Sequence, residues 1–459
     1  MLKCGASGVS VNPDWTVNHY RWIVWKFASL IRTFPDSYSP ANLSPSWILS
    51  QLLYRYEREI HLCHRSALKK IVERDDAAGK YLCLMVSGVD YERKSLELSD
   101  GWYSIWTSSL DISLWSAVKS NRIVEGVKME ISGASLTGQD ALPALEASSL
   151  DSPCKLVICR NSCRPARWDT KLGFMVSPRY KCFTFLKQLN QIHPQGGPIP
   201  AVSVIIDRVY PMLFKEERVV SESTIQTTRN ERDHYLYLET HPEQAQTSKF
   251  TPIQRIRVST NHVGPLTSVI VSFWNPLGEE QMALLQEGAA VIITNLRPSN
   301  RANSTSLSLV STKSTRLFKD KDNREIRDRD TSNVGVNAPT AFVVIDSMHF
   351  YKLKDLKAND TIDLIGGIFL GRSGSYFWIG SPDNEESDMI LVCLKNFPSI
   401  SALAAGDSLN FRDLSFNHFD AREGVVHFNF TEYSDFRLQC KGGATGYKRS
   451  QSRFNELTK

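Results

Sequence analysis

Apolar side chains recur at spacings of three and four residues in the first part of the chain, which is the period of an amphipathic helix. Residues 14–32 form one such segment. Ser44 and Pro45, a cap and a first-turn residue, open a second segment whose apolar face continues to Asp75. The pattern therefore predicts a helical domain over residues 1–76.

After Gly79 the sequence changes to short stretches that alternate apolar and polar residues, which is the period of a strand. One order of segments occurs three times: an aromatic-rich strand, a short apolar helix, and a glycine that opens another strand. The helices are expected at residues 114–118, 282–285 and 400–404, and the glycines are Gly126, Gly288 and Gly406. A barrel of five strands with a helix before its fourth strand has this order, and glycine tolerates positive φ at the helix end. The expected fold class is α+β, with an N-terminal helical domain followed by three tandem OB-fold β-barrels.

Changes in composition indicate where the domains end. Residues 319–330 are densely charged and cannot bury a face, which predicts a linker. Residues 231–249 are polar, which predicts an excursion between strands of the second barrel, and the glycine-rich stretch after Lys441 predicts disorder. The expected domains are a helical domain 1–76, a first OB fold 77–197, a second OB fold 198–320 with a short excursion 231–250, a linker 321–336, a third OB fold 337–440 and a disordered tail 441–459.

Composition allows several classes of partner and disfavours others. The chain has 459 residues and a net charge of +5, which permits a polyanionic partner without requiring one. Nine cysteines, an odd number, indicate free thiols in a reducing compartment. The sequence has no apolar run long enough to cross a bilayer and opens on no signal-peptide pattern, so we expect no membrane association.

Sequence motifs give little support to catalysis or metal binding. Cys154, Cys159 and Cys163 lack CxxC spacing and a nearby histidine, so small core thiols are favoured over zinc. Residues 366–373 have the outline of a phosphate-binding loop, but Arg372 replaces the lysine and the intervening residues are strand-like. A strand entering a hairpin is favoured there. No HExxH, GxSxG or paired CxxC motif occurs, and we expect no enzyme, no metal and no cofactor.

Aromatic rings and cations on barrel strands are typical of proteins that bind single-stranded nucleic acid, because bases stack on rings and cations follow the phosphates. Neighbouring strand residues point to opposite faces, so one member of each pair 273–274 and 377–378 faces away from the barrel interior. Core packing is the alternative for each aromatic taken singly. The candidate DNA-binding residues are Arg255, Arg257, Trp274, Lys313, Arg316, Arg372, Tyr376, Trp378, Lys395 and Arg412.

The stretch 160–174 interleaves four cations with Trp168 and Phe174, which suits an anionic partner. An ordinary basic loop with a buried tryptophan is the alternative. Together with residues 67–76, 100–103 and 133–136, this stretch resembles the DNA-binding region of the breast cancer type 2 susceptibility proteins. Other motifs that carry the resemblance are residues 18–27, 54–56, 73–76, 164–168, 170–174 and 229–232.

The resemblance implies a single-stranded DNA-binding module of a homologous-recombination mediator, acting in double-strand break repair in the nucleus and helping to load a RecA-like recombinase. In that family, DNA is bound chiefly by the second and third OB folds. A small acidic protein, deleted in split-hand/split-foot and shared with the proteasome lid, lies across the helical domain and first OB fold. The candidate residues for this acidic partner are then Arg21, Trp22, Trp25, Arg55, Arg58, Lys69, Lys70, Arg164, Arg167 and Trp168.

The sequence also departs from the family. The family carries a long helical tower before the segment matching Thr251, whereas the short stretch here would rise at most about 15 Å as a helical hairpin. Asp169 replaces an aromatic residue, and no Phe-x-x-Ala repeat occurs, so we expect this chain to be part of a longer protein that holds the recombinase elsewhere. The alternatives are a subunit similar to replication protein A, whose zinc ribbon would need a CxxC motif, and an OB-fold scaffold that binds peptides.

Overall fold

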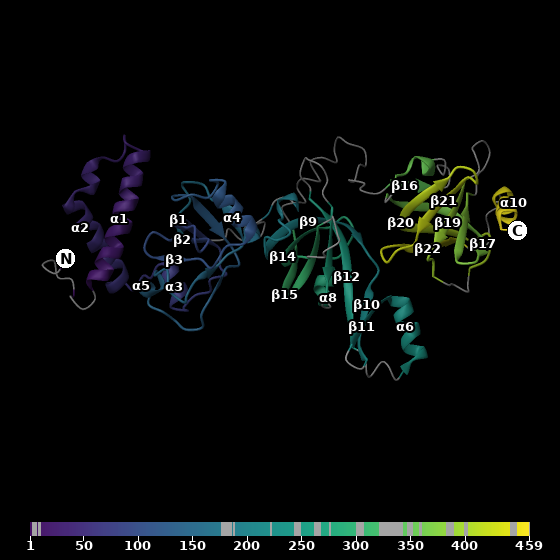
Figure 1. The fold of residues 1–459 in the computed structure, drawn as a ribbon, viewed down its shortest axis with the longest axis horizontal. Coiled ribbons are helices and arrows are strands. Elements are labelled where there is room, and N and C mark those ends of the chain that lie inside the picture. Colours follow the sequence, from purple (N-terminus) through teal and green to yellow (C-terminus); the bar gives the residue numbers. More distant parts are fainter. Residues whose placement is uncertain are drawn as a thin grey trace. The chain divides into compact units, whose positions relative to one another are not determined.

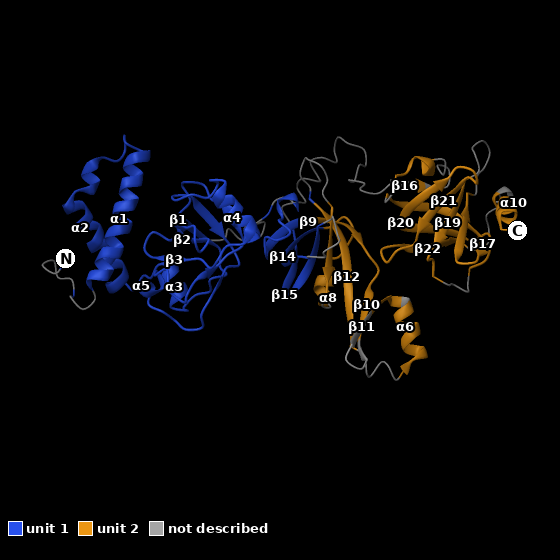
Figure 2. Cartoon of the chain, viewed as in Figure 1, with its two compact units in different colours: residues 1–204, 260–262, 290–320 blue, residues 205–259, 263–289, 321–459 orange. Residues whose placement is uncertain are grey.

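The computed structural model describes residues 1, 7, 11–175, 186, 189–220, 223–242, 249–260, 268–274, 277–299, 307–320, 343–346, 352–357, 360–381, 390–398, 403–440 and 448–458. In chain order, helices are followed by three groups of strands (Figure 1). The chain forms two compact units (Figure 2): unit 1 comprises residues 1–204, 260–262 and 290–320, and unit 2 comprises residues 205–259, 263–289 and 321–459. The units divide the second barrel, so their limits differ from the predicted domain boundaries.

Two capped helices open the chain, as the apolar stripes predict. Helix α1 (Pro13–Thr33) starts at Asn12, whose side chain accepts a hydrogen bond from the Trp15 amide. After a 3-10 turn, η2 (Pro40–Leu43), helix α2 (Pro45–Tyr56) is capped by Ser44. Their shared core consists of Trp15, Ile23, Phe27, Ile48, Leu52 and Tyr56.

The predicted continuation of the second helix to Asp75 is wrong. A π-helical turn, η3 (Glu57–His61), follows α2, and Cys63 then takes a left-handed backbone conformation with φ 53°. Ser66 caps a separate helix, α3 (Ala67–Val72), whose apolar residues pack in the core of the first barrel. The predicted single helix is divided because the apolar residues of α2 pack in the helical core, whereas those of α3 pack in the core of the first barrel.

The first barrel has the strand order β3-β2-β1-β4-β7, and β8 also pairs with β1. Thr107 and Leu156 add a parallel bridge just beyond the end of β3. Helix α4 (Ile112–Lys119) precedes β4, as predicted for the helix before a fourth strand. The other elements are β1 (Leu82–Asp90), β2 (Ser95–Ser99), β3 (Ser104–Trp106), β4 (Lys128–Ile131), β5 (Ser135–Leu136), α5 (Ala144–Ala147), β6 (Leu156–Val157), η4 (Arg160–Ser162), β7 (Cys163–Pro165), β8 (Gly173–Phe174) and η6 (Leu189–Gln191).

The second and third sheets close into five-stranded rings. The second runs β12-β13-β15-β14-β9 with β9 returning to β12, and the third runs β17-β18-β19-β21-β20 with β20 returning to β17. When the five strands of each ring are numbered in chain order, they follow one another around the barrel as 1-2-3-5-4. This is the strand order of the OB fold, which confirms the predicted fold class. The elements are β9 (Ile199–Val209), β10 (Leu213–Val220), β11 (Ser223–Asn230), α6 (Glu231–Thr240), β12 (Lys249–Ser259), β13 (Val269–Phe273), α8 (Glu279–Met282), β14 (Ala290–Pro298), β15 (Ser308–Lys319), β16 (Val343–Asp346), β17 (Thr361–Ser373), β18 (Tyr376–Gly380), β19 (Leu391–Lys395), β20 (Ser408–Asp420), β21 (Val425–Asn429), β22 (Asp435–Cys440) and α10 (Lys448–Leu457).

The glycine of each predicted copy has a positive φ: 90° at Gly126, 83° at Gly288 and 100° at Gly406. This confirms the reason given for glycine at these positions. The alignment of the copies is partly wrong, because β19 intervenes in the third barrel between the aromatic strand and Gly406. That aromatic strand is the second of its barrel, whereas the matching strands elsewhere are third. In the second copy the helix has the predicted length but lies three residues earlier than predicted, and in the third copy residues 400–402 lie outside the described residues.

Two segments that the sequence left without regular structure contain helices. The predicted excursion 231–250 begins with α6, which Asn230 caps, and the β10–β11 hairpin directly before it extends the segment inserted into the second barrel. The tail predicted to be disordered contains α10, because Phe454 finds an apolar surface on the third barrel. The predicted linker 321–336 lies outside the described residues.

Candidate nucleic-acid interface

The outer face of the third barrel brings together two candidate DNA-binding residues. On β18, Phe377 and Ile379 are buried in the barrel core, so Tyr376 and Trp378 share the opposite face. Tyr376 is 39% exposed and lies directly across the ladder from Lys395, which is also exposed. The two side chains therefore start from neighbouring positions on the same face of the sheet.

Trp378 faces outward as predicted, but helix α10 covers it. The side chain is 8% exposed, and its ring centroid lies 5.8 Å from that of Phe454. The sequence pattern identified the correct face of the strand. It did not indicate that a helix covers Trp378, because α10 is distant from β18 in the sequence.

The two remaining cations of the third barrel have contacts within unit 2. Arg372 is exposed and donates from Nη2 to the Pro398 carbonyl oxygen at 2.7 Å. Arg412 pairs with Glu287 at 2.7 Å. This ion pair lies in the wall of a groove of about 720 Å³. The groove is lined by Val209, Leu285, Gln286, Glu287, Asp363, Ile365, Asn410, Phe411, Arg412 and Arg437. Two carboxylates and two guanidinium groups balance in this lining, so the groove has no excess of positive charge to favour phosphates.

In the second barrel Trp274 is the best-placed aromatic residue. It follows β13 directly and is partly exposed, whereas Phe273 is fully buried, as strand alternation predicts. Lys215 of β10 lies over the Trp274 ring, with Nζ 5.3 Å from the centroid. The sequence analysis missed Lys215, because the β10–β11 hairpin that carries it was not predicted.

Arg255 is buried and Arg257 is partly buried, and both lie against carboxylates of the third barrel inside unit 2. Arg255 is 5% exposed, with Nη1 2.5 Å from Glu432. Arg257 Nη1 lies 3.8 Å from Asp413. Since a buried, paired guanidinium has no free face for a phosphate, neither residue is kept in the proposed interface. Lys313 and Arg316, on β15 in unit 1, are exposed.

Several residues predicted to bind an acidic partner instead form a buried polar network in unit 1. Glu59 accepts hydrogen bonds from Lys69 Nζ at 2.7 Å, Tyr103 Oη at 2.6 Å and Trp15 Nε1 at 3.2 Å. His19 Nε2 lies 3.1 Å from the same carboxylate. Burial alone would raise the pKa of Glu59, but hydrogen bonds from His19, Lys69 and Tyr103 lower it to about 2.

Arg55 and Arg21 also have internal partners. Arg55 is buried, donates from Nη2 to the Gly101 carbonyl oxygen at 2.9 Å, and has Nη1 3.0 Å from His19 Nδ1. Arg21 forms two hydrogen bonds to Glu97, at 3.2 and 2.9 Å, and its guanidinium lies 4.5 Å from the ring centroid of Trp22. Trp22 is buried, so it belongs to the core rather than to a partner surface.

The basic stretch 160–174 divides into paired and exposed residues. Arg164 bonds to Glu130 and Tyr81. Trp168 is 68% exposed, so the alternative of a buried tryptophan is wrong, and its ring centroid lies 5.1 Å from that of Phe34. Arg167, next to it, is exposed and pairs with Asp169 at 3.1 Å. The other exposed or partly exposed candidates are Trp25, Arg58 and Lys70.

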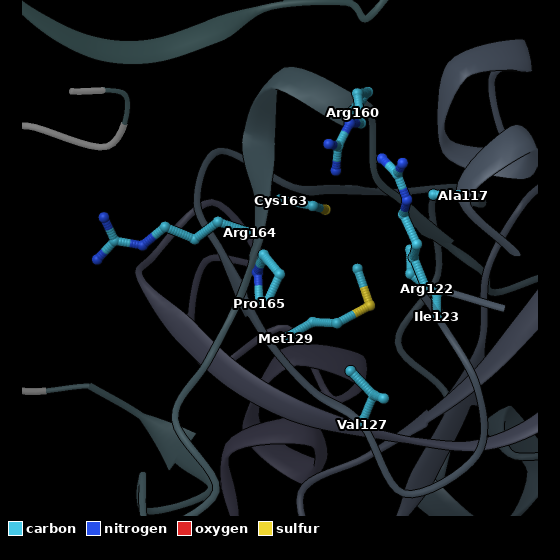
Figure 3. Close-up of a pocket in the computed structure, with 9 residues that line it drawn as sticks. All are labelled: Ala117, Arg122, Ile123, Val127, Met129, Arg160, Cys163, Arg164 and Pro165. Carbon is cyan, nitrogen blue, oxygen red and sulfur yellow. The ribbon is translucent and has the colours of Figure 1, made fainter. Parts of the chain in front are cut away.

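A small cavity of about 70 Å³ lies in the first barrel (Figure 3), lined by Ala117, Arg122, Ile123, Val127, Met129, Arg160, Cys163, Arg164 and Pro165. Arg122 and Arg160 extend toward one another, whereas the Arg164 side chain points away from the cavity. Drug-sized ligands need roughly 300 Å³ or more. This cavity is therefore too small to be the main nucleic-acid site.

Within the described residues, no three His, Cys, Asp or Glu side chains gather into a possible metal site, and Cys154, Cys159 and Cys163 are free thiols. Among the described helices, none is both long and apolar enough to span a membrane.

Helices followed by tandem OB barrels define a class of multi-OB proteins. Residues 3–63 match the family model described as BRCA2, helical, and residues 66–176 match the model described as BRCA2, oligonucleotide/oligosaccharide-binding, domain 1. Over these residues the chain is similar to the helical and first OB domains of BRCA2-type proteins, which confirms the resemblance.

Curated relatives agree with this assignment. The chain is 33% identical over 248 residues to protein BREAST CANCER SUSCEPTIBILITY 2 homolog A of Arabidopsis thaliana, and 32% identical over 248 residues to homolog B. Each match spans 50% of this chain but only 21% of the relative. The chain thus matches about a fifth of the relatives' length.

Among solved structures, the chain is similar to a replication protein A heterotrimer bound to ssDNA, with 10% identity, a TM-score of 0.30, and coverage of 59% of this chain and 55% of that one. It is also similar to the Ifi202 HINa domain in complex with 20bp dsDNA, with 12% identity, a TM-score of 0.28, and coverage of 53% and 98%. Scores this low carry no conclusion about function.

Proposed function

We propose that this chain is a non-catalytic, single-stranded DNA-binding module of a homologous-recombination mediator that acts in double-strand break repair in the nucleus. The observation that carries the proposal is the exposed Tyr376 ring beside Lys395 on the outer face of the third barrel. Trp274 beneath Lys215 repeats this combination on the second barrel. The match of residues 3–176 to BRCA2 domains supports the role in recombination, with a RecA-like recombinase held by segments outside this chain.

The proposal is tested by the variants Tyr376→Ala, Lys395→Ala and Trp274→Ala, with Tyr91→Ala as the control. Tyr91, in the first barrel, is 65% exposed. Fluorescence anisotropy with oligo-dT should show a loss of affinity of about fivefold or more for each aromatic variant, because one stacked base contributes about 1–3 kcal/mol. Lys395→Ala should lower the slope of affinity against salt by about one ion. Unchanged affinity in all three variants would exclude this interface.

The same titration separates the alternative functions. A scaffold that binds peptides would bind neither oligo-dT nor duplex. A subunit similar to replication protein A would bind oligo-dT in the same way but would not co-purify with a recombination complex. Weaker binding to a duplex of equal length is expected, because paired bases do not offer their faces for stacking.

A small acidic protein is also proposed as a partner of unit 1. The observation that favours it is the exposure of Arg167 and Trp168, which no buried contact requires. The double variant Arg167→Glu, Trp168→Ala should lose the acidic protein in co-purification, whereas Lys119→Glu, an exposed charge reversal on α4, should retain it. Retention by the double variant would count against this surface.

A further inference from the structure

The outer face of the third barrel carries an apolar patch that strand alternation does not require. Phe377 and Ile379 fill the barrel core, while Trp378 joins an outer cluster with Leu370, Leu391, Cys393 and Val425. Large exposed apolar patches on soluble proteins mark interaction sites. Here the patch is covered by α10, through Phe454 and Leu457. Helix α10 lies beside β17 of the third barrel (Figure 1).

Two glycines form the seat of α10. A Cβ at Gly371 would lie 2.7 Å from the Phe454 ring, and no other contact restricts that position. A Cβ at Gly380 would lie 2.7 Å from Ser450 Cβ. Neither glycine has a positive φ, so glycine here permits the close approach of the helix rather than a special backbone conformation. The seat is therefore fitted to α10.

The fit is nevertheless incomplete. The indole Nε1 of Trp378 is buried and has no hydrogen-bond acceptor among the described residues. A buried donor without an acceptor destabilises the covered state. Helix α10 also makes polar contacts on this face: Ser450 Oγ donates to Ser381 O at 3.3 Å, Gln451 Nε2 to Leu370 O at 3.2 Å, and Arg453 Nη2 to Glu423 O at 2.6 Å.

The cover ends within the proposed DNA-binding face. Tyr376 and Trp378 lie two residues apart on the same side of β18, yet Tyr376 is 39% exposed and Trp378 only 8%. We propose that α10 is an autoinhibitory cover, and that single-stranded DNA and α10 compete for Trp378. This inference rests on the proposed DNA-binding function. Displacing α10 would extend the stacking surface from one ring to two.

The competition is tested with two variants of the full chain that remove or displace α10: a deletion of residues 448–459, and Gly371→Ala, which meets only Phe454. Both should bind oligo-dT about fivefold more tightly than the wild type, the gain from one stacked base. Adding Trp378→Ala should cancel the gain. Ser452→Ala, exposed on the same helix, should bind like the wild type. If the wild type binds oligo-dT and the deletion variant binds it no more tightly than the wild type, the inference is overturned.

Alkylation of Cys393 gives a readout that does not depend on affinity. Cys393 is buried in the patch, and burial raises the pKa of its thiol to about 11, so it should react slowly while α10 is seated. Peptide-level mass spectrometry should show faster N-ethylmaleimide labelling in Gly371→Ala, and in the wild type on addition of oligo-dT. Cys83, buried in the first barrel, should stay protected. If Cys393 of Gly371→Ala is labelled faster but the protein does not bind oligo-dT, the proposed function is refuted, while the role of α10 as a cover stands. If oligo-dT binds but does not change the labelling rate of Cys393, the competition between DNA and α10 is refuted.

Discussion

Two buried ionic clusters differ in how closely they hold their central carboxylate. In unit 1, Glu59 accepts three hydrogen bonds between 2.6 and 3.2 Å. In unit 2, the nearest cations to Asp413 are more distant, with Arg208 Nε at 3.4 Å and Arg257 Nη1 at 3.8 Å. Burial favours the protonated form of both groups, yet the pKa of Glu59 falls to about 2, whereas burial raises the pKa of Asp413 to about 6 despite the two arginines.

In these two clusters the direction of the pKa shift follows the hydrogen bonds to the carboxylate, which Glu59 accepts from charged and polar side chains, whereas the arginines act on Asp413 only through their charge. The internal carboxylates also explain why basic residues were mistaken for contact surfaces. Lys69 in unit 1 and Arg257 in unit 2 were both predicted to face a partner or DNA, and both lie instead against an internal carboxylate. A row of cations in a sequence does not reveal which of them the fold neutralises.

The largest effect is expected from Glu59→Gln. The Glu59 carboxylate is itself buried and binds Lys69 Nζ, so breaking this pair should cost unit 1 about 3–5 kcal/mol of stability. Hydrogen exchange of the β1 amides in the full chain measures this loss. Glu57→Gln is the matched control, since the Glu57–His61 pair is exposed, and it should change stability by less than about 0.5 kcal/mol. A smaller effect at position 59 than at 57 would contradict the role of the cluster.

A smaller effect, of opposite sign in the two units, is expected from pH. The pKa of Glu59 is lowered from 4.5 to about 2, so its contribution is present above 4.5 and lost as pH falls toward 2. Burial lowers the pKa of His19 below 6.5, so acid also favours the unfolded form of unit 1 from that pH downward. Asp413 has a raised pKa, so its contribution is present below 3.8 and lost as pH rises through about 6.

Hydrogen exchange at pH 5 and pH 7, corrected for intrinsic rates, measures both responses in one sample. From pH 7 to pH 5, protection of β1 should fall, because His19 favours the unfolded form below pH 6.5. Protection of β20 should rise by about 1 kcal/mol, since Asp413 has a pKa of about 6 and one pKa unit corresponds to about 1.4 kcal/mol. If protection of β1 and protection of β20 both rise or both fall from pH 7 to pH 5, the two ionic clusters do not differ in their response to pH.

The smallest effect is expected from Asp413→Asn. Position 413 has a left-handed backbone with φ 53°, which asparagine tolerates, and Arg208 keeps its 2.7 Å contact with Asp363. At pH 7 the stability of unit 2 should therefore change by about 1 kcal/mol or less, and the pH response of β20 should disappear. Glu423→Gln, an exposed control on the same barrel, should retain that response.

Local features of the fold could be predicted from the sequence, but contacts between distant segments could not. Gly126, Gly288 and Gly406 were identified because a helix end followed by a strand requires a particular backbone angle, which is a local property. The contact of Lys215 with Trp274 joins different strands, and no periodicity records it. Helix α10 was missed because Phe454 and Leu457 are too few apolar residues to indicate a buried face.

The segment inserted between β9 and β12 is attached to the second barrel in a way that allows its length to vary. Val209 pairs with Ile256, and the Tyr210 amide bonds to the Arg255 carbonyl oxygen at 3.0 Å, so the ladder joins both ends of the inserted arm. Since each doubling of a flexible loop adds only about 0.6 kcal/mol of closure entropy, the arm can shorten or lengthen with little cost to the barrel. A barrel of this kind accepts arms of very different reach at the same two positions.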